Sequence, residues 1–466
     1  LRVLNAATDE QVNGRVSRIA EMKVLRAHYY FELSRLFNKI PYFDENVEIS
    51  QYPDIPNNEF TRDEILSMLA KEMLDAAELL PASQSEVGRI HKYIALAYAA
   101  KIKLYQAYQQ DEITHAVTSI NKELLREVVS LCDQVTASNR YGLLDDFQGL
   151  DLVANENGKE SVFTIQYSMN DGTESAGRIN WSNLLNSPGG GSPYGGDGFF
   201  LPSQDLINAY QTDANGLPDF NYQSKSDYSW AVLNNGVYTL QNTTPNVDPR
   251  LDFVVGRPTI TWKTYPDKPC EGWVRDKETY GYNCAKRFWV SPESSDMFNG
   301  WPWGASQLNW QIIRYADILL WKAEALIELN EGDGLETARD LINQIRNRAR
   351  NSAYVKDFND HSKYAANYLV NPYPADVWNQ DYARQALRWE TRLEKALEGE
   401  RFFDLVRWGI VETTMNKYIT AESDNRIYYA NAHFTGGKDE YYPVPNNQYG
   451  FSGGKYVQNP GYAPFN

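Results

Sequence analysis

Cysteine is scarce in this sequence, with three residues, Cys132, Cys270 and Cys284, among 466. Three cysteines at these spacings form neither a disulfide framework nor a zinc-binding pattern. Cys132 falls in an apolar helical stretch, so we expect a buried thiol there. Cys270 and Cys284 lie in a loop-rich stretch and leave both a disulfide and two free thiols open, because spacing alone does not fix disulfide geometry.

Long apolar runs are also missing. No stretch of 18 or more apolar residues occurs, which argues against a transmembrane helix. No signal peptide is present, and the sequence opens at Leu1 without a methionine, inside what resembles a helix. We therefore expect a processed or trimmed chain whose export signal or lipid-carrying cysteine lies outside the given sequence.

The chain has no excess of basic residues, because its formal net charge is −16. Nucleic-acid-binding proteins show a basic patch or stripe, so this charge argues against a nucleic-acid partner. It also argues against docking on anionic lipid through basic side chains. A neutral ligand is compatible with such a charge.

Catalytic and cofactor-binding patterns are absent as well. The five histidines are scattered, without the spacing of a catalytic metal site. No serine-hydrolase elbow surrounds Ser192, and the glycine run at 189–198 fits neither a phosphate loop nor a dinucleotide fingerprint. We expect no catalytic residue, no metal and no cofactor. The segment 213–216 resembles part of a calcium loop but lacks the later glutamate, so a turn is the better interpretation.

Apolar residues recur at helical spacing in two parts of the chain. The pattern predicts helices over 15–38, 61–80, 89–110 and 121–138, and again over 311–330, 335–350 and 381–416, the last interrupted near Gly399. Thr61 and Glu64 form a capping box at the start of the second helix. The repeated helix pairs with alanines at close approaches are typical of tetratricopeptide repeats.

The fold class that follows is mainly α, with about four tetratricopeptide-like helix pairs as a scaffold. We expect residues 1–466 to form a single domain, with the scaffold in 1–140 and 310–416. Residues 141–309 and 417–466 are irregular, ligand-facing and capping segments with short β-like runs such as 161–167 and 251–255. Function usually sits on such loops, because the scaffold fixes their position.

Aromatic residues are abundant, at 13% of the chain, and half of the twelve tryptophans fall between residues 262 and 310. An aromatic face stacks on the apolar face of a sugar ring, while neighbouring polar groups bind hydroxyls. For any single ring, packing in a core is the better interpretation. For the cluster, and above all for the Gly-Trp-Pro-Trp-Gly turn at 300–304, we favour glycan binding. The candidate ligand-binding residues are Trp273, Tyr280, Tyr282, Trp289, Trp301 and Trp303.

Charged residues in two further places have structural interpretations. Asp145, Asp146 and Asp151 are expected to be solvated turn residues, although a glycosidase carboxylate pair stays open on sequence alone. Arg401, Asp404 and Arg407 stand at helical spacing, which predicts an ion-pair network bracing the last helix pair.

Several segments, in order along almost the whole chain, resemble those of the SusD/RagB outer-membrane nutrient-binding lipoproteins of Bacteroidetes. They are residues 21–33 (EMKVLRAHYYFEL) with 40–41 (IP), 201–207 (LPSQDLI), 248–251 (DPRL), 281–282 (GY) with Lys286, 313–325 (IRYADILLWKAEA), 398–409 (EGERFFDLVRWG) and 442–445 (YPVP). The series is specific, although each segment alone is weak.

The resemblance implies a protein anchored by lipid on the extracellular face of the outer membrane, with no membrane contact beyond an anchor outside this chain. It also implies a partner, a TonB-dependent transporter of the SusC type, over which the chain closes as a lid. Ligands in the family are mostly oligosaccharides, with peptides for some members. The lipid-bearing cysteine and most of the segment before the first helix are absent here, and no ligand residue is carried over because these vary in the family.

Three alternatives remain beside an oligosaccharide-binding protein that is not an enzyme. The first is a peptide-binding member of the same family. The second is a glycoside hydrolase with its carboxylates in the irregular segment, and the third is an adaptor whose helical repeats bind a peptide. A bound calcium and the identity, linkage and length of the ligand are left open by the sequence.

Overall fold

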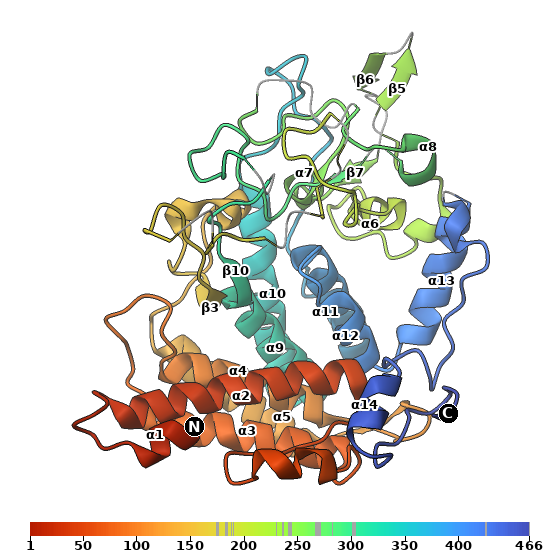
Figure 1. Ribbon diagram of the computed structural model, residues 1–466. Helices are drawn as coiled ribbons and strands as arrows, with labels where there is room; N and C mark the ends of the chain where they lie inside the picture. The colour runs from red at the N-terminus through yellow and green to blue at the C-terminus, as the bar shows by residue number, and fades with distance from the viewer. Residues whose placement is uncertain are drawn as a thin grey trace.

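The computed structural model describes residues 1–465, except residues 174–176, 182–184, 188, 190, 230, 235–236, 241–244, 266–271, 282, 301–303 and 425. Of residues 231–234, 237–240, 277 and 278 it describes the backbone alone. The described part is mainly helical with a few short strands, as the sequence predicts. Its longer helices form two groups that are far apart in the sequence and adjoin in space (Figure 1).

The first group contains the N-terminal helices, which cross the lower part of Figure 1. At the start of the second long helix, the Thr61 side chain accepts a hydrogen bond from Glu64 N, and the Glu64 carboxylate accepts one from Thr61 N, so the predicted capping box is confirmed. Helix α4 (Lys92–Ala107) is buried on nearly all sides because its alanines let its neighbours approach closely. The helices are α1 (Arg2–Ala6), α2 (Arg15–Phe37), α3 (Arg62–Leu79), α4 (Lys92–Ala107) and α5 (Lys122–Ala137).

The second group follows the irregular insertion, residues 141–309. Gly399, with a φ of 82°, lies in the predicted interruption between two of its helices. The helices are α9 (Tyr315–Leu329), α10 (Gly334–Asn351), α11 (Gln380–Glu394), α12 (Arg401–Arg407), α13 (Val411–Ser423) and the short C-terminal α14 (Asn446–Phe451). The pairs α2–α3, α4–α5, α9–α10 and α11–α12 correspond to the predicted helix pairs.

The predicted helix 311–330 begins four residues late. Residues Trp310–Arg314 form strand β10, which pairs antiparallel with β3 (Ser161–Ile165), and α9 starts only at Tyr315. Two adjacent isoleucines, which favour strands, precede the helix. The Asp317 carboxylate accepts a hydrogen bond from Arg314 N at 2.9 Å and fixes the helix start there.

The two groups share one hydrophobic core, which explains why they stand side by side. Val24, Ala97, Cys132, Ile318 and Leu405 all belong to it, and α5 packs against α9. Burial of apolar surface between segments far apart in sequence holds the scaffold together. Among the described helices, none is both long and apolar enough to cross a membrane.

The irregular insertion occupies the upper part of Figure 1 and is built from short elements. Each strand there belongs to a two-stranded antiparallel pair among the described residues. The strand pairs of the chain are β1 (Tyr108–Gln110) with β2 (Val117–Ile120), β3 with β10, β4 (Gln211–Thr212) with β7 (Asn246–Val247), β5 (Ala231–Asn234) with β6 (Val237–Leu240), and β8 (Val255–Gly256) with β9 (Cys284–Ala285). The short helices of the insertion are α6 (Gln204–Ala209), α7 (Arg250–Val254), α8 (Lys277–Tyr280), η2 (Phe147–Asp151), η3 (Val153–Asn155) and η4 (Tyr222–Ser224). Two more lie outside it, η1 (Ile49–Asp54) and η5 (Ile427–Tyr429).

Of the two predicted β-like runs, 161–167 is confirmed over residues 161–165, which form β3. The prediction of a strand over 251–255 is wrong. Residues 250–254 form helix α7, and only Val255 enters a strand. The Asp248 carboxylate accepts a hydrogen bond from Arg250 N at 3.0 Å, and Pro249 has a helical φ of −60°. Together they start a helix where the apolar residues alone favour a strand.

A buried network of ion pairs joins the insertion to the second helix group. Glu394, which is fully buried, pairs with Arg314 at 2.6 Å, with Arg250 at 3.1 Å and with Arg348. Burial disfavours the charged carboxylate, but the three guanidinium groups outweigh this and lower the pKa of Glu394 to about 2. Because each charge is compensated by others in the network, it keeps its partners in fixed positions.

The predicted network around Arg401, Asp404 and Arg407 is confirmed in part. Arg407 pairs with Asp404 at 3.0 Å and with Glu324 of α9. Arg401, in contrast, makes no ion pair with a described residue, and its guanidinium carbon lies 6.0 Å from the centre of the Trp408 ring. Its burial is the main reason that the pKa of Arg401 falls to about 9.

Candidate ligand-binding site

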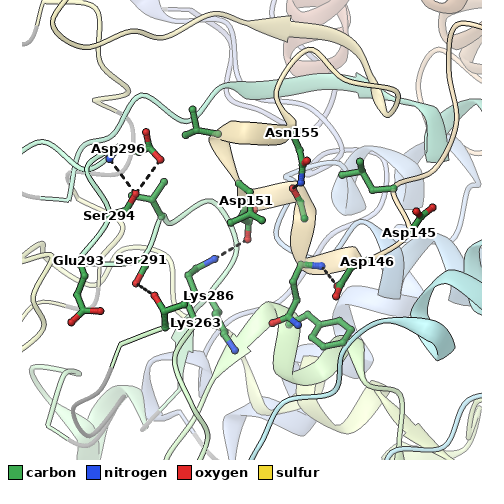
Figure 2. A pocket seen from close by; sticks show the side chains of 18 of the residues that line it. Asp145, Asp146, Asp151, Asn155, Lys263, Lys286, Ser291, Glu293, Ser294 and Asp296 are labelled. Atoms are coloured by element: carbon green, nitrogen blue, oxygen red, sulfur yellow. Dashed lines mark hydrogen bonds and ion pairs between the residues drawn. The ribbon is translucent and has the colours of Figure 1, made fainter.

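A pocket of about 970 Å³ opens in the irregular insertion, between residues 144–155 and residues 263–296 (Figure 2). Its size is that of a site for a drug-sized or oligomeric ligand. Most of the lining residues have polar side chains, and Phe253 is the one aromatic residue among those described. The lining residues with polar side chains are Asp145, Asp146, Gln148, Asp151, Asn155, Lys159, Lys263, Thr264, Lys286, Ser291, Glu293, Ser294 and Asp296.

Asp151 joins the two walls of the pocket. Its carboxylate accepts hydrogen bonds from Lys263 Nζ at 3.2 Å, Arg287 Nε at 3.1 Å and Phe288 N at 3.1 Å. The prediction of a solvated turn residue is therefore wrong for Asp151, whose exposed fraction is 3%. Burial alone would raise the pKa of Asp151, but Lys263, Arg287 and the backbone N–H outweigh it and hold the pKa below its ordinary value.

Asp145 behaves as predicted, whereas Asp146 is half-buried and bonded to the backbone. The Asp145 carboxylate is exposed and pairs with Lys159 at 2.9 Å. The Asp146 carboxylate accepts hydrogen bonds from the backbone N–H groups of Gln148 at 2.8 Å and Ala353 at 3.1 Å. Asp146 therefore caps η2 and fixes the start of the pocket wall.

The far side of the pocket is connected to the helical scaffold. Arg287, which holds Asp151, also donates to Glu398 at 3.3 Å, and Glu398 accepts from Arg314 Nε at 3.0 Å. Arg314 in turn belongs to the buried network around Glu394. A continuous set of charged contacts thus runs from the pocket to the helices, so the pocket has a rigid support.

Two non-glycine residues at the pocket have a left-handed backbone. The φ angles are 49° at Lys263 and 68° at Phe288. Such conformations cost about 1–3 kcal/mol each and persist where surrounding contacts impose them, often at ligand sites. Lys263 and Phe288 both donate to Asp151, so the contacts that impose the strain are those that shape the pocket.

The rim of the pocket presents hydrogen-bonding groups to solvent. Glu293 is exposed, and it makes no hydrogen bond to a described residue. Ser294 Oγ donates to Asp296 at 3.0 Å, and Asn155 Nδ2 donates to Gly149 O at 2.9 Å, so both are already oriented (Figure 2). Within the described part of the chain, no three His, Cys, Asp or Glu side chains gather as a metal site requires. The arrangement suits a ligand rich in hydroxyl groups.

Two of the predicted binding residues lie inside a small core. Trp273 and Trp289 are only 4% and 3% exposed, and they pack with Trp262 and Tyr194. For each of these rings alone the sequence favours packing in a core, and aromatic partners from distant segments do cover them. The ring centres of Tyr194 and Trp289 are 4.8 Å apart, and those of Trp262 and Trp273 are 5.0 Å apart. Ligand contact by these two tryptophans stays a prediction.

Tyr280 is the predicted binding residue that reaches the surface among those described, with 43% of its area exposed. Its ring lies 5.9 Å from that of Tyr428, a residue of the C-terminal segment that the sequence pattern did not single out. Tyr282, Trp301 and Trp303 lie outside the described residues, as does Cys270. Cys132 and Cys284 are buried free thiols, and burial raises the pKa of Cys132.

The pocket itself escaped the sequence-based argument. Its walls come from short turns and 3-10 helices, which have no apolar periodicity. The one sequence signal of the pocket was the group of aspartates at 145–151. Sequence alone gave no reason to expect that one of them is buried. Only the position of Arg287 and Lys263 in space gives Asp151 its role.

The fold described here is a tetratricopeptide-like helical scaffold that carries a large irregular insertion with a braced polar pocket. Three comparisons with known proteins agree with it. The sequence profile of the SusD family matches residues 159–462. A SusD-like protein of Formosa agariphila is 24% identical over 467 aligned positions, which cover 99% of this chain and 77% of that protein.

Solved structures show the same fold. A SusD-like carbohydrate-binding protein of Bacteroides fragilis superposes with a TM-score of 0.66 at 20% identity, over 94% of this chain and 79% of that one. A laminarin-binding SusD-like protein gives a TM-score of 0.57 at 20% identity, over 98% of this chain and 80% of that one. The family match extends over well more than half of the sequence, and the chain belongs to the SusD family.

Proposed function

We propose that this chain is a cell-surface nutrient-binding protein that captures an oligosaccharide for import by a TonB-dependent outer-membrane transporter of the SusC type. The observation that carries the proposal is the SusD family match over residues 159–462, which includes one whole wall of the pocket. We take residues 1–466 as a single domain, held on the extracellular face of the outer membrane by a lipid anchor. The protein binds its ligand without turnover.

The pocket supports a hydroxyl-rich ligand. Its rim offers carboxylates, amides and hydroxyls, and its volume accommodates more than one sugar unit. The net charge of −16 disfavours polyanionic ligands. The six aromatic residues named from the sequence, Trp273, Tyr280, Tyr282, Trp289, Trp301 and Trp303, remain our proposed stacking partners, with Tyr280 the one seen at the surface among the described residues.

Calorimetry against a glycan panel tests the proposal. We expect saturable binding of at least one neutral glycan, with laminarin included because a structural neighbour is named for it. Glu293→Ala removes an exposed acceptor from the rim and should weaken binding by about 1.5–3 kcal/mol, the range for hydrogen bonds to charged groups. Glu336→Ala on α10, where 70% of the side chain is exposed, is the matched control and should bind as the unaltered protein does.

Several results would contradict the proposal in different ways. Binding of peptides but of no glycan favours a peptide-binding member of the family. Release of product from a labelled oligosaccharide contradicts the assignment as a binding protein without turnover. If Glu293→Ala and Glu336→Ala bind the glycan with equal affinity, the ligand binds elsewhere than in this pocket. Recovery of a large β-barrel protein with the chain from outer membranes supports the transporter partner, and recovery of a soluble helical partner argues for an adaptor.

A further inference from the structure

Four tyrosines from two distant parts of the chain meet where α8 lies beside the upper end of α13 (Figure 1). We call them the tyrosine ledge: Tyr280, Tyr418, Tyr428 and Tyr429. Tyr280 and Tyr428 have 43% and 52% of their surface exposed, whereas Tyr418 and Tyr429 are half-buried. The exposed pair has ring centres 5.9 Å apart and ring planes tilted by 39°. Two partly exposed phenol rings therefore lie close together at the surface.

The half-buried pair fixes the position of the exposed one. Tyr429 packs against Tyr428 with ring centres 4.7 Å apart, and its hydroxyl shares a hydrogen bond of 3.0 Å with the hydroxyl of Tyr418. Tyr418 stands on α13, a helix of 13 residues, so the C-terminal half of the ledge is anchored to regular structure. A tyrosine held in this way loses little conformational entropy when a ligand binds.

Gly281 follows Tyr280 at the end of α8. Its φ is 77°, in the left-handed region that favours glycine. The guanidinium group of Arg426, two residues before Tyr428, lies against Gly281. The two segments that carry Tyr280 and Tyr428 are therefore in contact here.

Ile427, which precedes Tyr428 in η5, is 80% exposed and adds apolar surface next to Tyr428 in the chain. Contiguous exposed apolar surface marks interaction sites. We propose that the tyrosine ledge is a stacking surface for a neutral oligosaccharide, separate from the braced pocket. The inference rests on the proposed function and adds a second contact surface to it.

The chemistry of the ledge favours an uncharged glycan. Each phenol ring offers an apolar face for the C–H face of a sugar and a hydroxyl for hydrogen bonding. The tilt of 39° suits two successive sugar units whose rings are not coplanar. A polyanionic glycan is disfavoured by the net charge of −16.

The test uses Tyr280→Ala and Tyr428→Ala with a panel of laminarin, starch, xylan and galactomannan oligosaccharides, and polygalacturonate as the acidic arm. Each alanine variant should bind its neutral glycan about 5- to 100-fold more weakly, by analogy with ring stacking on nucleic-acid bases. Tyr280→Phe and Tyr428→Phe keep the ring and should retain most of the affinity. Tyr29→Ala on α2, where the ring is 70% exposed on the scaffold, is the matched control and should bind normally.

A second measurement does not depend on variants. Tetranitromethane nitrates exposed tyrosines, and we expect bound neutral glycan to protect Tyr280 and Tyr428 but not Tyr29, as mass spectrometry of the peptides would show. Suppose that the unaltered protein binds a neutral glycan, that both alanine variants bind it with the same affinity, and that the glycan does not protect Tyr280 and Tyr428 from nitration. The tyrosine ledge is then overturned, and the proposed function stands. Binding of polygalacturonate alone overturns the ligand class. A protein that binds no glycan at all overturns both.

Discussion

His115 lies in the tight turn between β1 and β2, with a φ of 56° and an exposed fraction of 3%. Its ring packs edge-on against Tyr441 with ring centres 4.8 Å apart. Burial is the largest reason that the pKa of His115 falls to about 4, and Lys39 and Arg62 lower it further, while Asp111 opposes them. At the scale of the residue, the neighbours of a side chain decide its chemistry, as they also do for Asp151.

A pH-dependent stability follows from His115. The unfolded chain binds a proton at this histidine near pH 6.5 and the folded chain only near pH 4, so stability is lost as the pH falls between these values. From pH 7.5 to 5.0, we expect the unaltered protein to lose up to about 2 kcal/mol more than His115→Asn. Asparagine tolerates the left-handed backbone. Urea denaturation at the two pH values measures the difference.

The exposed His433 supplies the control for this experiment. His433→Asn should leave the pH dependence of the unfolding free energy as it is in the unaltered protein. Equal pH dependence in His115→Asn and the unaltered protein would show that burial of His115 does not govern this loss.

At the scale of the element, local signals and tertiary contacts compete. The start of α3 follows its local signal, because Thr61 and Glu64 satisfy each other's backbone groups within four residues of chain. The start of α9 does not, because pairing with β3 draws residues 310–314 into a strand. Trp273 and Trp289 depend on tertiary contacts too, since rings from distant segments cover them.

Removal of the cap should weaken α3 measurably. Thr61→Ala deletes the side chain that accepts from Glu64 N, and we expect a loss of about 1 kcal/mol in the free energy of unfolding. Ser67→Ala, at an exposed position within the same helix, should have no effect or a slightly stabilising one, since alanine has the higher helix propensity. Guanidinium denaturation compares the two variants. A loss in Ser67→Ala as large as that in Thr61→Ala would contradict the role of the cap.

At the scale of the whole molecule, the buried ion pairs connect elements that the sequence keeps apart. Glu394 of α11 contacts arginines of α7, β10 and α10, and through Arg314 and Glu398 the same network reaches Arg287 beside the pocket. The segments 248–251, 313–325 and 398–409, which resemble the SusD family, supply many of these charges. These three segments therefore share a structural role, because their charged side chains form the buried network.

Glu394→Gln tests the network. The amide keeps the shape of the side chain but leaves three arginines without their common counter-ion, and we expect a loss of about 3–5 kcal/mol in the free energy of unfolding. Because the pKa of Glu394 is lowered to about 2, its contribution is complete above about pH 4.5 and is lost as the pH falls toward 2. Denaturation at pH 7 measures the loss, with the exposed Glu336→Gln as the control. A loss below 1 kcal/mol would show that the network adds little stability.

Much of the scaffold could be predicted from the sequence. The helices α2, α3, α4, α5, α9 and α10 lie within a few residues of the predicted ranges, because helical periodicity and capping are properties of neighbouring residues. The strand β3 was predicted in the same way. The aromatic cluster was predicted as a glycan-binding surface, which stays a prediction, and three of its tryptophans belong to one buried core.

The sequence by itself determined the mainly helical fold, the split into two helix groups and the resemblance to one family, because these depend on spacing along the chain. Only the tertiary structure decided which charges and rings are exposed. The Asp151 carboxylate is held by Lys263 and Arg287 from another segment, and Tyr280 has Tyr428, from the C-terminal segment, as its neighbour. Exposure is a property of contacts between distant residues, which no local pattern records.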